Sequence, residues 1–226
     1  MMIELKNRQQ RARAVYRGIA TFYCLLCISL VILYAILHDT YHLGVSLGAL
    51  AFPIALPLVW KLPFLKRVWS LDCLILGFVF LAYPLGSCVD LFYWLPGYDK
   101  VAHTLSGTFV SLLALILYYS LKPGHAIERK DKVLATVFML LASIAVAGLW
   151  EIGEYALSGI VGRDLQHVVT TGVADSMQDM IVCTLGTMAA VPVSLRLSGG
   201  KKGVLSNMVR DTICLHFGEQ TDTQGG

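Results

Sequence analysis

Six ionisable side chains in the apolar part of this chain occur in three closely spaced pairs. The pairs are Asp99 with His103, Glu151 with Glu154, and Asp175 with Asp179. Their members are three or four residues apart, which places both side chains of a pair on one face of a helix. A charged side chain inside a membrane costs at least about 2.5–3.5 kcal/mol, so such residues mark functional sites. We therefore expect the three pairs to form one polar site.

Five carboxylates and one imidazole make a set of mainly hard oxygen ligands. Such a set favours Mg²⁺ or Mn²⁺, and a mixed site of histidine and carboxylates also suits Zn²⁺. The predicted metal ligands are Asp99, His103, Glu151, Asp175 and Asp179. In a metal-dependent reaction, His103 or Glu154 would serve as the general base. The alternative is that the acids cap their helices, reach water, or form a structural network without metal.

Two further residues are predicted to contact a substrate. Gln178 follows Asp175 by three residues and so shares its helix face. Arg163 lies in the glycine-containing connection 158–172, which is able to fold over the site. Its guanidinium would either pair with a site carboxylate or bind a phosphate group.

The composition predicts an all-α, polytopic membrane protein. Of the 226 residues, 56% are hydrophobic and only 15% are charged, against about 25% charged in a soluble domain. A spanning helix needs about 20 mostly apolar residues, and six segments meet that requirement. They are 15–38, 41–60, 70–94, 101–121, 133–157 and 173–197. Residues 1–197 are thus predicted to form one six-helix domain, and residues 198–226 a disordered cytoplasmic tail.

The distribution of basic residues predicts the orientation of the helices. With these six spans, all of the 18 lysines and arginines except Lys100 and Arg163 fall on one side of the membrane. The positive-inside rule then places both termini in the cytoplasm and the acidic pairs at the outer face. The basic side needs no binding partner other than the anionic headgroups of membrane lipids. Nothing in the chain indicates nucleic-acid binding.

Three segments carry a resemblance to a known family. The sequences YDKVAHTLSG at 98–107, LWEIGEY at 149–155 and GVADSMQDM at 172–180 resemble the YjdF-like family of bacterial inner-membrane proteins. More distantly they are similar to VanZ-like proteins, which are associated with resistance to glycopeptides that act on the cell wall. The resemblance implies a multi-pass protein of the bacterial cytoplasmic membrane. It supports the six polar positions as a unit and suggests lipid chemistry in the cell envelope.

Three functions are compatible with these features. The first is metal-dependent chemistry on a phosphate-bearing envelope lipid, and the second is a non-catalytic membrane protein that binds a lipid or a partner. The third is a cation or proton transporter, since acids and histidines inside membranes line such pathways. Against transport, the polar groups lie in one outer layer, Asp72 near the inner end of the third span is the only intramembrane acid on the other side, and no inverted repeat is visible. Whether the protein is an enzyme is left open by the sequence.

Overall fold

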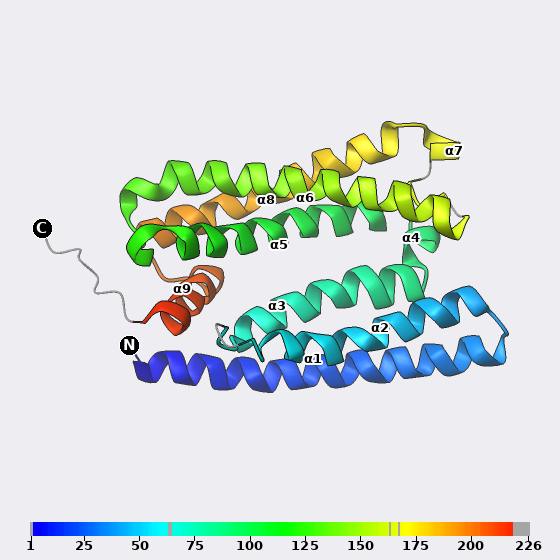
Figure 1. Ribbon diagram of the computed structural model, residues 1–226, viewed down its shortest axis with the longest axis horizontal. Helices are drawn as coiled ribbons and strands as arrows, with labels where there is room; N and C mark the ends of the chain where they lie inside the picture. The colour runs from blue at the N-terminus through cyan, green and yellow to red at the C-terminus, as the bar shows by residue number, and fades with distance from the viewer. Residues whose placement is uncertain (1, 63–64, 163, 167, 219–226) are drawn as a thin grey trace, which may run out of the picture. The chain divides into compact units, whose positions relative to one another are not determined.

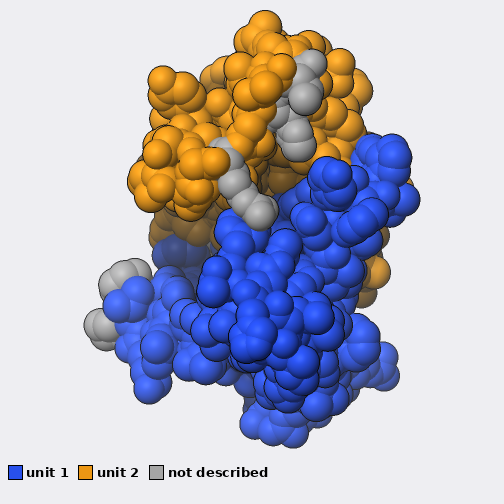
Figure 2. Space-filling model, turned by 90° about the vertical axis from the view of Figure 1, so that its right-hand side faces the viewer, with its two compact units in different colours: residues 1–98, 211–226 blue, residues 99–210 orange. Residues whose placement is uncertain are grey.

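The computed structural model describes residues 2–62, 65–162, 164–166 and 168–218, and these residues form helices and no strand (Figure 1). The chain separates into two compact units, whereas the sequence predicts one six-helix domain (Figure 2). Unit 1 contains residues 1–98 and 211–226, and unit 2 contains residues 99–210.

Six helices are long and apolar enough to cross a membrane, as predicted. They cover Ile3–Ile36, Thr40–Val59, Trp69–Cys88, Tyr98–Leu121, Arg129–Val161 and Ala174–Ser198. Many of their large apolar side chains are exposed, which suits helices whose outer surface is solvated by lipid tails. The protein is therefore an all-α, multi-pass membrane protein.

Unit 1 is built on the longest helix of the chain. Its elements are α1 (Met2–Ile36), α2 (Thr40–Val59), α3 (Trp69–Phe80), the π-helix η1 (Leu81–Cys88) and α4 (Leu91–Trp94). Tyr23 of α1 is fully buried and donates a hydrogen bond of 3.0 Å from its hydroxyl to the carbonyl oxygen of Ala49 in α2. Tyr34 donates in the same way to the carbonyl oxygen of Cys88, at 2.6 Å. These bonds satisfy tyrosine hydroxyls that would otherwise be unpaired in an apolar core.

The third predicted span, 70–94, is not one continuous α-helix. Pro84 lies within η1, where its missing N–H disrupts the regular hydrogen-bond ladder and a π-helical turn replaces it. Asp90 then has a φ of 66°, which ends the helix before α4 begins. The spanning part of this segment is therefore Trp69–Cys88.

Unit 2 contains three long helices joined by short elements. They are α5 (Tyr98–Leu121), η2 (Pro123–His125), η3 (Arg129–Asp131), α6 (Lys132–Val161), α7 (Val168–Thr171) and α8 (Ala174–Ser198), followed by the start of α9 (Val204–Phe217). The first turns of α5 and α8 and the last turns of α6 carry the acidic pairs predicted from the sequence.

Two glycines allow α5 and α8 to cross in direct backbone contact. A Cβ atom at Gly107 of α5 would lie 1.8 Å from the carbonyl oxygen of Cys183, and one at Gly186 of α8 would lie 1.9 Å from that of Thr104. Thr108 donates a hydrogen bond of 2.8 Å from its hydroxyl to the carbonyl oxygen of Gly186. Small residues are what close packing of membrane helices requires. The crossing holds the first turns of both helices together, and these turns carry the candidate site.

The prediction of a disordered tail from residue 198 is wrong for residues 204–217, which form α9. Within unit 1, Arg8 of α1 and Asp211 make a two-pronged ion pair, with Nη2–Oδ1 and Nε–Oδ2 distances of 2.7 and 3.0 Å. Val209 and Ile213, four residues apart, are both buried. The polar composition of the whole tail hides this short helical pattern, because an average over 29 residues is dominated by its two ends.

Candidate functional site

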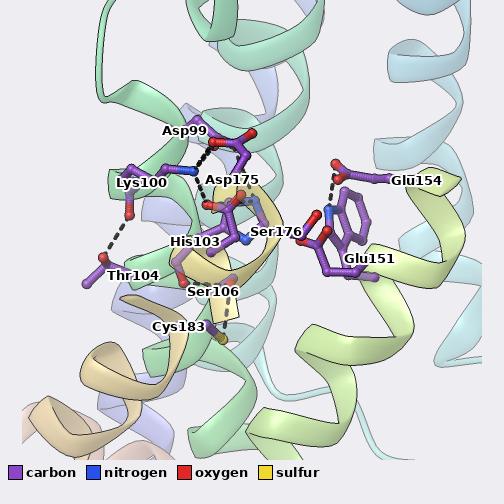
Figure 3. Close-up of polar contacts among 12 residues, drawn as sticks. Asp99, Lys100, His103, Thr104, Ser106, Glu151, Glu154, Asp175, Ser176 and Cys183 are labelled. Atoms are coloured by element: carbon purple, nitrogen blue, oxygen red, sulfur yellow. Dashed lines mark hydrogen bonds and ion pairs between the residues drawn. The ribbon is translucent and has the colours of Figure 1, made fainter. Parts of the chain in front are cut away.

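The amino group of Lys100 lies at the centre of three aspartates. Its Nζ atom donates hydrogen bonds to Oδ1 of Asp175 at 2.6 Å and to Oδ2 of Asp99 at 3.1 Å (Figure 3). It donates a third to Oδ1 of Asp179, at 2.8 Å. His103 lies against two of these aspartates, Asp99 and Asp179. We refer to Asp99, Lys100, His103, Asp175 and Asp179 as the Asp–Lys–His cluster.

Two helices of unit 2 supply all five side chains. Asp99, Lys100 and His103 belong to the first turns of α5, and the spacing of four residues brings Asp99 and His103 to one face, as predicted. Asp175 and Asp179 belong to the first turns of α8. The cluster therefore depends on the glycine-mediated crossing of α5 and α8 that holds these turns together.

His103 contacts two of the three aspartates. Its Nε2 atom lies 3.3 Å from Oδ1 of Asp99 and 3.8 Å from Oδ1 of Asp179. Asp179 is 4% exposed, so its Oδ1 atom is a buried acceptor shared between lysine and histidine. Three carboxylates against one lysine leave the cluster with an excess of negative charge. Such an excess in a buried place favours the binding of a further cation, whether a proton or a metal ion.

Three of the five predicted metal ligands come together with the spacing of a metal site. One ligand atom each of Asp99, His103 and Asp179 lies within 4.8 Å of the others. Two ligands of a tetrahedral ion with bonds of about 2.0–2.1 Å are about 3.4 Å apart. The separations of 3.3 and 3.8 Å between His103 and the two carboxylates are close to that value. Asp175 is not one of these three residues, and it accepts the shortest of the hydrogen bonds from Lys100.

The two glutamates of α6 lie beside the cluster, each with a partner of its own (Figure 3). Glu151 is 8% exposed and accepts a hydrogen bond at Oε2 from Nε2 of Gln166, at 3.2 Å. Glu154 accepts one at Oε1 from the indole of Trp150, at 2.9 Å. Glu151, one of the five predicted metal ligands, is thus hydrogen-bonded to the connection between α6 and α8. Glu154, the candidate base, keeps one carboxylate oxygen outside this hydrogen bond.

Gln166 connects three parts of unit 2. Its Nε2 atom lies 3.0 Å from the carbonyl oxygen of Glu151, and 3.5 Å from Oγ of Ser176 at the start of α8. Through these contacts Gln166 links the end of α6 to the start of α8. Arg163, predicted to bind substrate from this connection, lies outside the described residues. Gln178, the other predicted substrate residue, is exposed and makes no hydrogen bond to the cluster in the described chain.

Sequence reasoning missed Lys100 and Gln166. It treated Lys100 only as one of two basic residues on the outer side, although a surplus of buried acids requires a counter-cation and Lys100 directly follows Asp99. That requirement was the available signal. Nothing comparable pointed to Gln166, because its partners are brought to it only by the folded connection.

A file of small polar side chains runs inward from the cluster, half-buried at Ser106 and buried beyond it. Ser106 Oγ lies 2.7 Å from the carbonyl oxygen of His103 and 3.7 Å from Sγ of Cys183, which lies 3.6 Å from Oγ of Ser143. Thr187 donates to Ser143 at 2.6 Å. The polar groups therefore extend beyond the single outer layer expected from the sequence. Farther along α8 the next buried positions, Ala190 and Val193, are apolar, and the buried serines Ser194 and Ser198 follow them.

The sequence matches the family described as "Predicted membrane protein (DUF2238)" over residues 19–199. The chain belongs to this family. The matched range contains all five cluster residues and the crossing glycines, so the site lies within what defines a DUF2238 protein. No curated protein and no solved structure matches the chain. The YjdF-like and VanZ-like resemblances therefore stay predictions, and the DUF2238 match supports membership of a family of predicted membrane proteins.

Proposed function

We propose that this membrane protein binds one divalent metal ion through Asp99, His103 and Asp179. The observation that carries the proposal is the convergence of these three ligand atoms within 4.8 Å, at a place where Asp179 is buried. A lone acid at a helix end needs no ligand, because it caps the helix or reaches water. Two carboxylates and an imidazole from two different helices match a metal site better than they match capping.

The ligand types favour Zn²⁺ or Mn²⁺ over Mg²⁺. Imidazole suits zinc and similar transition metals, whereas Mg²⁺ prefers oxygen ligands in octahedral geometry. Three protein ligands would leave a position open for water or substrate, which is the arrangement of catalytic rather than structural zinc. With His103 engaged as a ligand, Glu154 is the better candidate for the general base.

The neighbouring lysine suggests the class of substrate. A divalent ion and a lysine side by side neutralise the charge of a phosphate group and of the transition state for its transfer or hydrolysis. The cluster lies in the first turns of two candidate spans, where lipid headgroups are within reach. We therefore propose a phosphate-bearing lipid of the cell envelope as substrate, at the outer face of the bacterial cytoplasmic membrane that the charge distribution predicts.

A second candidate is a non-catalytic role in which the cluster is a structural ion-pair network. The three hydrogen bonds of Lys100, at 2.6–3.1 Å, favour it, because the lysine already supplies a cation to every aspartate of the cluster. The two candidates differ in what a divalent ion does. In the structural network an added metal ion has no site, whereas in the metal centre it binds and stabilises the fold.

Calorimetric titration of the detergent-purified full chain with Zn²⁺ and Mn²⁺ tests the proposal. We expect one ion per chain, and a loss of at least about tenfold in affinity for Asp179→Asn, which is about 1.4 kcal/mol. Glu4→Gln is the matched control, because it also removes one negative charge but lies on α1 of unit 1. Absence of binding to the parent protein, or an equal loss in the control, would exclude the metal site.

A further inference from the structure

A pocket in unit 2 is lined by four basic side chains. It has a volume of about 330 Å³ and lies between the start of α6 and the end of α8. Its basic residues are Arg129, Lys132, Arg196 and Lys201. The Asp–Lys–His cluster is at the other end of α8, in its first turns. All four basic residues are exposed, so a ligand has access to them.

The four basic side chains have no counter-ion from the described part of the chain. The nearest acids along the sequence, Glu128 and Asp131, are both paired with Lys122, and Glu128 also with Lys130 at 3.2 Å. The hydrogen bond from Lys122 holds the pKa of Glu128 below its ordinary value, so this acid stays charged and committed to Lys122. The positive charge of the pocket is therefore available to an external anion.

Helix stability does not explain these positions. A basic residue in the last turn of a helix interacts favourably with the helix dipole, and Arg196 in the last turn of α8 fits that role. Arg129 and Lys132 are at the opposite kind of end, in η3 and at the first residue of α6. There the dipole disfavours positive charge and favours an anion. A ligand that brings negative charge would remove this conflict.

We propose that this pocket binds the phosphate headgroup of an anionic membrane lipid. Arg129 and Arg196 lie in the terminal turns of two candidate spans. The pocket therefore opens where the surface of a membrane meets water. Leu195 also lines the pocket and is 49% exposed, and Val133 beside Lys132 is 65% exposed. These apolar surfaces can contact the acyl chains of a lipid whose headgroup lies among the basic side chains. Basic pockets between spanning helices bind anionic headgroups in this manner. The proposal is independent of the metal site.

The test compares three probes on the detergent-purified full chain. They are short-chain phosphatidylglycerol, short-chain phosphatidylcholine and inorganic phosphate, each titrated by native mass spectrometry or calorimetry. Arg129→Gln/Arg196→Gln removes two charges from the pocket. Lys130→Gln/Lys202→Gln is the matched control. It also removes two charges, from positions next in sequence to the lining residues Arg129 and Lys201 but not themselves lining the pocket.

We expect phosphatidylglycerol to bind the parent at least about tenfold more tightly than either other probe, and the arginine double variant to lose about tenfold in affinity. The control should stay within about threefold of the parent. An equal loss in both variants would show a diffuse surface charge and overturn the proposal. Equal binding of inorganic phosphate and phosphatidylglycerol would overturn the lipid as ligand. Should the double variant lose its helical circular dichroism, Arg129→Gln alone, at an exposed position, must still weaken binding.

Discussion

The Nζ atom of Lys100 lies 2.8 Å from Oδ1 of Asp179, and the same oxygen is a candidate metal ligand. A lysine and a divalent ion at this oxygen are therefore competitors, or neighbours that share the negative charge of the cluster. Either relation makes metal binding sensitive to the charge of residue 100. This sensitivity also distinguishes the metal centre from a structural network, in which Lys100 would be the cation that the aspartates require.

Replacing the imidazole is expected to change which metal ions bind. His103→Ala should reduce Zn²⁺ affinity by at least about tenfold and affect Mg²⁺ much less, because imidazole is the ligand that favours zinc. Competition with a zinc-binding dye measures the Zn²⁺ affinity of each protein, and competition of Mg²⁺ with bound Zn²⁺ measures the Mg²⁺ affinity. His38→Asn is the control, since His38 is exposed in the connection between α1 and α2 and asparagine tolerates its φ of 54°. Unchanged Zn²⁺ affinity in His103→Ala would remove His103 from the ligand set.

The crossing of α5 and α8 is expected to be intolerant of a single methyl group. Gly186→Ala would place a Cβ atom 1.9 Å from the backbone oxygen of Thr104, so the helices must separate. We expect a loss of about 1–3 kcal/mol or more in the free energy of unfolding, with loss of metal binding. Gly153→Ala on α6 has no atom within 4 Å of its added carbon and should be close to neutral. Thermal unfolding in detergent compares the two, and equal stability would show that the helices do not cross there.

Much of this architecture follows from local sequence. Six spans and the pairing of Asp99 with His103 depend only on apolar length and on the period of a helix, and both are visible in the chain. The role of Lys100 depends on Asp175 and Asp179, some 75 residues away, and sequence spacing holds no information on that distance. The close crossing at Gly107 and Gly186 is likewise a tertiary event.

Gln166 is expected to hold the connection between α6 and α8 in place. Gln166→Ala would leave Glu151 without the hydrogen bond to Oε2 and should cost about 1–3 kcal/mol of local stability, because Glu151 is buried. Hydrogen exchange should quicken in residues 158–172 and little elsewhere. Gln178→Ala, at an exposed position, serves for comparison and should leave the exchange of this connection unchanged. The same exchange in both variants would contradict the bridging role of Gln166.

The ion pair of Arg8 with Asp211 is expected to keep residues 211–217 of α9 folded against α1. Arg8→Ala should expose the C-terminal helix and increase tryptic cleavage at Arg210, because Asp211 is 2% exposed and would lose both hydrogen bonds. The loss corresponds to about 1–3 kcal/mol. Arg11→Ala, at an exposed position one turn away, is the comparison. Limited proteolysis decides the point, and identical digestion patterns for the two variants would show that the pair is dispensable.

The most direct test of the metal centre is a Zn²⁺ titration of Lys100→Met beside the parent protein. Methionine removes the cation that shares Oδ1 of Asp179 and leaves every proposed metal ligand in place. We predict that Lys100→Met is less stable without metal, binds Zn²⁺ at least about tenfold more tightly than the parent, and regains stability on binding. Loss of stability with no binding of Zn²⁺ or Mn²⁺ to either protein would contradict the metal centre. It would show the cluster to be a structural network around Lys100.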